Sequence, residues 1–177
     1  MRIISQLLFI FVPVCFLLGS EFNPENSKRA MNLHQHVFRV KRSLFLQIYP
    51  PPATLGEWIN GVKGYLSKLR GEEISAWRKK LQETPEAGER YMVVEPGTLF
   101  RIERIFIMVT GSFDISPFHA ILLNGPLKGK IITGCIYVGS QPQKDDSRAL
   151  GSDDLEDLGK LSDEELKQKG LPSVLRE

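Results

Sequence analysis

The chain has 177 residues, of which 42% are hydrophobic and 25% charged. This is the profile of an ordinary globular protein with one modest core, so a single domain is expected. The formal net charge of +2 is too small to indicate nucleic-acid binding, but it is unevenly distributed, because the segment from Lys144 onward is acid-rich and leaves the preceding body basic. A basic body can face an anionic surface or polymer, and a solvated face without a partner is the simpler interpretation.

The N-terminal segment has the order of a secretory signal. Arg2 precedes an apolar run that reaches Leu18 and contains Pro13, and a polar segment follows. The run is shorter than the roughly 20 apolar residues that span a bilayer, which favours a cleaved signal over residues 1–20 and an exported protein, periplasmic or extracellular. Retention as a membrane anchor, or a lipid on Cys15, is the alternative, since Leu18 stands where a small residue is usual before cleavage.

Cysteine use favours a buried thiol. Without the signal, Cys135 is the one cysteine left, so no intrachain disulfide is expected. It lies in an apolar, β-branched run, where cysteine usually behaves as a small hydrophobe. The enzymatic alternative is a thiol-dependent envelope hydrolase with Cys135 as nucleophile and His119 as base. The sequence contains no Gly-x-Ser-x-Gly or His-Glu-x-x-His motif.

The first predicted element after the signal is extended chain. Apolar and polar residues alternate from Val37 to Ile48, and the prolines from Pro50 stop the pattern. The alternation slips between Lys41 and Ser43, so the sequence predicts either a bulged strand or two short strands.

Two helices are predicted next. The first begins at the capping box Thr54 to Glu57, and Gly71 ends it. Its apolar residues are three and four apart, as on one face of a helix: Leu55, Trp58, Ile59, Val62, Leu66 and Leu69. The second covers "EEISAWRKKLQE", with acids first and lysines last as the helix dipole prefers, and stops at Pro85. Trp58 and Trp77 are expected in the core rather than in a ligand platform.

From Tyr91 the hydrophobic period becomes that of strands. Pro96-Gly97 is typical of a turn, and a strand follows it into an apolar run that ends at Val109. Two further strands are predicted on either side of a glycine-rich turn at residues 124–129, after a connecting loop at residues 110–117.

The stretch "GPLKGK" at residues 125–130 ends in the Gly-Lys pair of a phosphate-binding loop. Such a loop needs four residues between its first glycine and that pair, then Ser or Thr, then a helix. Here three residues intervene, Ile131 replaces the hydroxyl, and a β-branched run follows. We therefore expect no nucleotide binding, and a hairpin turn in which Gly125 and Gly129 adopt positive φ.

The segment from Tyr91 to Val138 resembles bacterial SH3-like barrels. "VEPGTLFRIERI" is similar to the proline-glycine turn and first strand of that family, and "AILLNGPLKGKIIT" to its paired strands around a glycine-rich turn. The resemblance implies a small binding or scaffolding barrel at about residues 91–139, and a fold alone does not identify the ligand. The predicted class is α+β: a small SH3-like antiparallel β-barrel preceded by a strand and a two-helix segment, within a single domain at residues 21–143.

Residues 144–177 are predicted to form an acidic, partly helical tail that is flexible or weakly docked. A second capping box begins a short helix at Ser162, and Gly170 closes it.

Four cations are predicted to share one basic strand face, the candidate partner-binding patch: Arg101, Arg104, Lys128 and Lys130. The partner is an unidentified protein or an anionic envelope polymer. Nucleic acid is not expected, and a membrane is a partner only if the N-terminal segment is retained.

No metal or cofactor is expected. His34 and His36 are far along the chain from His119, and no carboxylate-histidine pair at helical spacing supports a site. These observations predict an exported, non-enzymatic binding or envelope-associated protein. Besides the thiol hydrolase, a periplasmic inhibitor or immunity-type protein is the alternative, and it predicts a tight stoichiometric complex.

Overall fold

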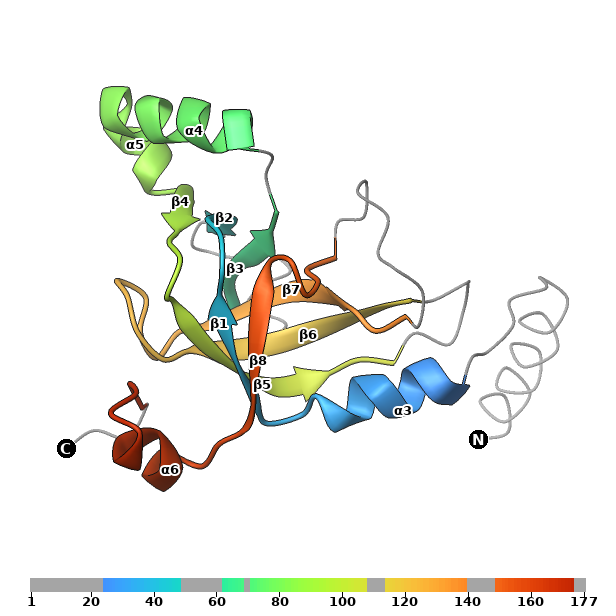
Figure 1. Cartoon of the computed structure of the whole chain (residues 1–177). Helices are drawn as coiled ribbons and strands as arrows, with labels where there is room; N and C mark the ends of the chain where they lie inside the picture. The colour runs from blue at the N-terminus through green and yellow to red at the C-terminus, as the bar shows by residue number, and fades with distance from the viewer. Residues whose placement is uncertain (1–23, 49–61, 69–70, 108–113, 140–148, 174–177) are drawn as a thin grey trace, which may run out of the picture.

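The computed structural model of the protein describes five stretches of the chain, residues 24–48, 62–68, 71–107, 114–139 and 149–173. They form a mixed α+β fold in which one eight-stranded sheet curls into a half-barrel with few helices around it (Figure 1). The α+β class is therefore confirmed. The predicted signal lies outside the described residues, and none of the described helices combines the length and hydrophobicity needed to cross a bilayer.

The sheet consists of β1 (His36–Val40), β2 (Leu44–Ile48), β3 (Val62–Ser67), β4 (Tyr91–Val94), β5 (Leu99–Ile105), β6 (Ile115–Leu122), β7 (Ile131–Tyr137) and β8 (Leu155–Lys160). The described helices are α3 (Pro24–Asn32), α4 (Gly71–Glu83), α5 (Pro85–Gly88) and α6 (Asp163–Gln168). The strands lie in the order β4-β2-β3-β7-β6-β5-β1-β8. All neighbours are antiparallel except β3 and β7, which are parallel.

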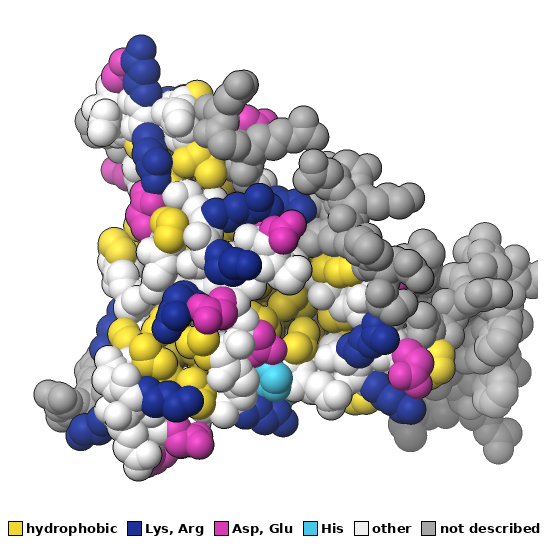
Figure 2. Space-filling view, in the orientation of Figure 1, with side chains coloured by type: hydrophobic (Ala, Val, Ile, Leu, Met, Phe, Trp, Pro, Cys, Tyr) yellow, Lys and Arg dark blue, Asp and Glu magenta, His cyan; other side chains and the backbone are white. Residues whose placement is uncertain are grey.

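The main core fills the inner face of the curl. Phe100 lies at its centre, with the rings of Phe38 and Phe118 centred 5.6 and 5.7 Å away. Each such buried side chain stabilises the fold by about 1.5–3 kcal/mol. Figure 2 shows hydrophobic side chains in the hollow at the centre of the visible face. A smaller core between the sheet and α6 consists of Val37, Leu99, Leu123, Leu161 and Leu166.

Several local predictions are confirmed. The slip between Lys41 and Ser43 separates two short strands, β1 and β2. The proline-glycine turn leads into β5, with Gly97 at φ 88°. The glycine-rich stretch is the hairpin turn between β6 and β7, and Gly125 and Gly129 have φ of 79° and 78°.

The first predicted helix is wrong where the structure describes it. The predicted start of this helix at Thr54 lies outside the described residues, and so does Trp58. Val62–Ser67, however, forms strand β3. Val62 and Leu66 are four residues apart, a spacing that places two side chains on one side of a helix and equally on one face of a strand. Between them, Gly64 lies so close to the Gln47 carbonyl of β2 that a side chain there would clash.

The second predicted helix is confirmed as α4. Trp77 packs from this helix against Phe45 and Tyr91, with ring centroids 4.8 Å apart in both cases. It therefore fastens α4 to β2 and β4, but it is half-buried and lies outside the two hydrophobic cores, unlike the core position expected. Helix α4 ends at Glu83, just before Pro85, as predicted, and Pro85 then occupies the first turn of the separate short α5, where its missing N–H costs nothing.

The predicted barrel does not stand by itself within residues 91–139. Its strands β5, β6 and β7 form the expected antiparallel meander, but the sheet continues through β1 and β8 on one side and through β3 and β2 on the other. The predicted loop at residues 110–117 is also too long, since β6 begins at Ile115.

The acidic C-terminal segment differs most from the expected flexible tail. At its first described residues, 149 and 150, it lies beside β7, where the Leu150 N–H donates to the Cys135 carbonyl at 2.8 Å. Then β8 pairs with β1, and α6 packs its fully buried Leu166 into the second core. The helix itself is confirmed, with Ser162 and Glu165 forming the capping box.

Opposite charges accompany the burial of leucines in this docking. Strand β1 and the turn after it are basic, and the segment that lies against them is acidic. His36 Nδ1 lies 2.9 Å from Asp157, and Arg39 lies 2.9 Å from Glu156 directly across the strand pair. Figure 2 shows Lys and Arg side chains next to acidic ones on this face. Part of the basic body therefore pairs within the molecule instead of facing a partner.

Candidate functional site

Helix α3, which the sequence pattern did not predict, is fastened to the end of the curled sheet. Asn26 and Ala30 are one turn apart and both buried. The Asn26 amide donates to Asp114 at 2.9 Å. Burial and then the Asp114 carboxylate raise the pKa of the neighbouring Tyr137 hydroxyl. This polar cluster fixes which side of α3 faces the sheet and leaves Met31 on the exposed side.

The junction between α3 and β1 is equally constrained. Gln35 has φ of 66°, which is unusual for a residue other than glycine. Its backbone N–H donates to the Ile102 carbonyl at 2.8 Å, and its side-chain amide donates to Glu103 at 3.3 Å. Gln35 thus holds the end of α3 against β5.

A groove lies between these two elements. It has a volume of about 450 Å³ and is lined by Met31, His34, Glu103, Arg104, Ile105 and Phe106. Among the described residues, the exposed large hydrophobic side chains are Met31 at 52%, Phe106 at 40% and Ile107 at 36%. Met31 and Phe106 line the groove, and Ile107 follows Phe106 just after the end of β5. We call this region the α3–β5 groove.

The charge of the groove is set by what each of its ionic residues already binds. Glu103 accepts a hydrogen bond from Gln35 and one from Arg101, so its charge is compensated. Arg104 is exposed and has no ion pair within the described residues. The groove therefore presents an apolar surface beside an uncompensated guanidinium.

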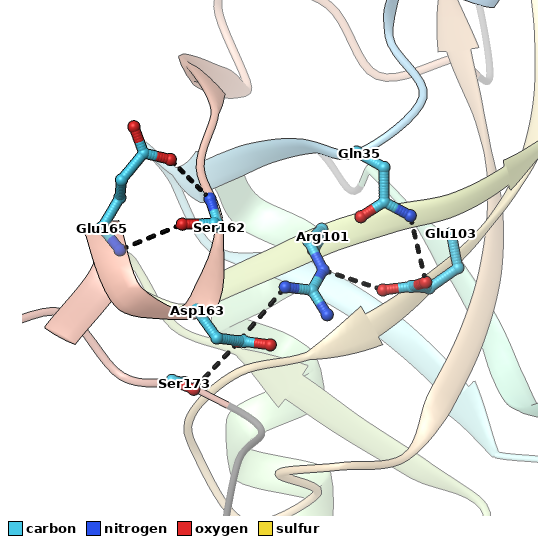
Figure 3. Close-up of polar contacts among 7 residues, drawn as sticks. All are labelled: Gln35, Arg101, Glu103, Ser162, Asp163, Glu165 and Ser173. Atoms are coloured by element: carbon cyan, nitrogen blue, oxygen red, sulfur yellow. Dashed lines mark hydrogen bonds and ion pairs between the residues drawn. The ribbon is translucent and has the colours of Figure 1, made fainter.

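Arg101, one of the four predicted cations, is engaged within the molecule. Its side chain is only 13% exposed, and it forms ion pairs with Glu103 at 2.8 Å and Asp163 at 3.2 Å (Figure 3). Burial alone lowers the pKa of Arg101, but the hydrogen bond and charge of Glu103, with Asp163, raise it overall. Asp163 is the first residue of α6 and also accepts from Ser173. Arg101 therefore joins the C-terminal segment to β5.

The other two predicted cations lie elsewhere on the sheet. Lys128 and Lys130 are exposed in and after the hairpin turn, and the Lys130 carbonyl accepts from the Leu122 N–H. Arg104 lies opposite His119, which is three residues, or about 10 Å, before Leu122 on β6. Arg104 is thus separated along the sheet from the two lysines.

Cys135 and His119 lie on the same face of neighbouring strands. Cys135 is opposite Pro117 and His119 is opposite Thr133, so the two are diagonal neighbours. The Cys135 sulfur accepts from the Tyr65 hydroxyl at 3.5 Å. The His119 ring packs edge-on against Phe106 at 4.8 Å, and burial, then the charge of Arg104, lowers the His119 pKa.

The three histidines have separate surroundings. His36 binds Asp157, His34 lines the α3–β5 groove, and His119 contacts Phe106. Within the described stretches, no group of three His, Cys, Asp or Glu residues is arranged to hold a metal ion.

Comparison with known proteins gives no match to a family model, to a curated protein or to a solved structure. The assignment of a site therefore rests on the geometry of this chain. Sequence reasoning singled out Arg104 but not the groove, because Met31 and His34 are separated from Phe106 by more than 70 positions and only α3 brings them together.

Proposed function

We propose that this protein is an exported, non-enzymatic binding protein that receives its partner in the α3–β5 groove. One observation carries the proposal: the exposed large hydrophobic side chains of the described residues gather at this groove, beside an arginine without an ion pair. Soluble proteins rarely leave grouped apolar side chains exposed without a use for them. Aromatic residues, methionine and arginine are also the types enriched in interfaces.

The non-enzymatic part of the proposal is supported by the surroundings of the thiol. A hydrolase would need the His119 imidazole to accept the Cys135 proton. The ring instead packs against Phe106, and Tyr65 is the hydroxyl that contacts the sulfur. Because Cys135 and His119 are diagonal neighbours, the thiol hydrolase is the competing hypothesis. Replacement of Cys135 distinguishes a hydrolase from a binding protein.

We also propose that the β5–β6–β7 meander is SH3-like. The support is local: a turn with a positive-φ glycine precedes β5, and a glycine-rich hairpin joins β6 to β7. The flanking strands would then be additions to that unit. A binding role agrees with this proposal, although the fold does not specify a ligand.

Export is the third part of the proposal, and its support is the order of charged, apolar and polar residues at the N-terminus. The intact mass of the protein from soluble and membrane fractions of the native host tests it. We expect a soluble pool that has lost about 20 residues, as cleavage of a signal requires. Full-length protein in the membrane fraction would show retention, and full-length soluble protein would contradict export.

The binding face is tested by photo-crosslinking in the native host. A benzophenone amino acid replaces Phe106 in one variant and Met31 in another, and Arg90, exposed between α5 and β4, is the control position. We expect adducts at the two groove positions and not at the control. Equal yields at all three positions would contradict a specific groove. A single stoichiometric protein adduct would favour the inhibitor or immunity-type alternative.

A further inference from the structure

We infer that the α3–β5 groove binds an anionic phospholipid surface, with Arg104 at a headgroup phosphate and Met31 and Phe106 at the acyl boundary. This inference rests on the proposed function, because it names the partner of the same groove. It follows from two features: the charge left uncompensated at the groove and the backbone hydrogen bonds around it.

The charge at the groove selects an anion. Glu103 is paired with Arg101, so the acid at the groove does not repel a phosphate, while Arg104 retains its donors. A guanidinium binds phosphate oxygens through parallel N–H donors. His34 lines the same groove and adds a second nitrogen donor. Exposed apolar side chains beside such a cation are typical of proteins that lie on an anionic membrane surface.

The backbone of the groove is not open to an added peptide strand. Strand β5 has β1 on one side and β6 on the other. At the groove itself, the Ile102 carbonyl accepts from Gln35, and the Phe106 N–H donates to the Pro117 carbonyl at 2.8 Å. A peptide that binds by strand addition needs such groups unpaired. The groove offers side chains alone, which suits a lipid surface better than an extended peptide.

The experiment uses the protein recovered from the soluble fraction in two vesicle preparations, one of phosphatidylcholine and one of phosphatidylcholine with phosphatidylglycerol. Each preparation contains a trace of diazirine-labelled lipid, which is phosphatidylcholine in the first and phosphatidylglycerol in the second. After illumination, lipid adducts are mapped by mass spectrometry. Arg104→Glu is the test variant, Met31→Glu is a second one on an exposed helix position, and Arg90→Glu is the matched control.

We expect adducts on the peptides that contain Met31 and Phe106, with a higher yield in phosphatidylglycerol. Arg104→Glu should lower that yield at least about tenfold, because reversing a charge near an anionic surface removes attraction and adds repulsion. Arg90→Glu should leave it unchanged. Equal adduct yields in both lipids would overturn the inference. So would an equal loss of adducts in Arg104→Glu and Arg90→Glu. Protein adducts in the host without lipid adducts here would overturn the lipid partner and leave the proposed function standing.

Discussion

The Arg101 guanidinium lies 2.8 Å from the Glu103 carboxylate on the same strand, and this pair determines the electrostatics of the α3–β5 groove. Without Arg101, the Glu103 charge would be available to the adjacent Arg104. With it, Arg104 keeps no ion pair within the described residues, and Arg101 in turn holds α6 through Asp163. Two arginines three positions apart on β5 thus differ: Arg101 is bound to acidic partners, while Arg104 is the one that we propose contacts a partner.

Replacing Arg101 by Met should destabilise the protein by about 1–3 kcal/mol, because Glu103 and Asp163 would stay half-buried without their cation. Urea denaturation of the variant and of Asp163→Asn, combined in a double-mutant cycle, measures the coupling. The exposed Arg90→Met is the control and should change stability by less than about 0.5 kcal/mol. A zero coupling energy would mean that Arg101 does not fasten α6.

Replacing Leu166 by Ala should cost about 2–5 kcal/mol, because this side chain of α6 is fully buried in the second core. Thermal unfolding measures the loss as a lower Tm. Leu158 on β8 packs against the same core but is only half-buried, so Leu158→Ala should cost less. An unchanged Tm in Leu166→Ala would support the flexible tail that the composition predicted.

The stability of the protein should depend on the protonation of His119. Burial, and then Arg104, lowers its pKa in the folded state below the ordinary value of about 6.5. The unfolded chain therefore binds the proton first, so this contribution is complete above about pH 6.5 and is lost as the pH falls through the lower folded pKa. His119→Gln should have a shallower decline in the free energy of unfolding on acidification. Parallel curves for both proteins would refute this linkage.

Cys135→Ala should leave crosslinking at the groove unchanged and alter stability by only about 1 kcal/mol, the size of one weak hydrogen bond. Tyr65→Phe removes the same contact and is the matched control. The deletion strain of the native host, complemented with each variant, supplies the biological readout. Loss of complementation by Cys135→Ala but not by Tyr65→Phe would favour the thiol hydrolase.

Local chemistry made part of the fold predictable. The glycines of the β6–β7 turn, the slip between β1 and β2 and the capping box at Ser162 each depend on neighbours in sequence. Strand β3 was mistaken for a helix because Val62 and Leu66 satisfy both periodicities. Strand β8 has too few apolar residues to be recognised, since its pairing with β1 depends on distant partners such as Arg39 for Glu156.

The site was predictable only in part. Strict alternation places Arg101 and Arg104 on opposite faces of the strand, and the irregularity in the pairing of β5 with β6 between Ile102 and Arg104 cannot be read from the sequence. Only the three-dimensional structure shows that Arg101 has acidic partners on β5 and α6. Met31 lies in a polar segment without a strong pattern, and its position beside Phe106 follows from the burial of Asn26 and Ala30 on the other side of α3.

The most direct test of the account is the yield of benzophenone adducts at position 106, measured per folded molecule in the Arg104→Glu and Arg101→Met backgrounds. We predict that Arg104→Glu abolishes the adducts and keeps the Tm of the parent protein, while Arg101→Met lowers the Tm and keeps the adducts. Two results would contradict this account: adducts that survive Arg104→Glu, or adducts that are lost in proportion to stability in both variants. Either result would mean that the two arginines do not differ as proposed and that the groove is not the binding site.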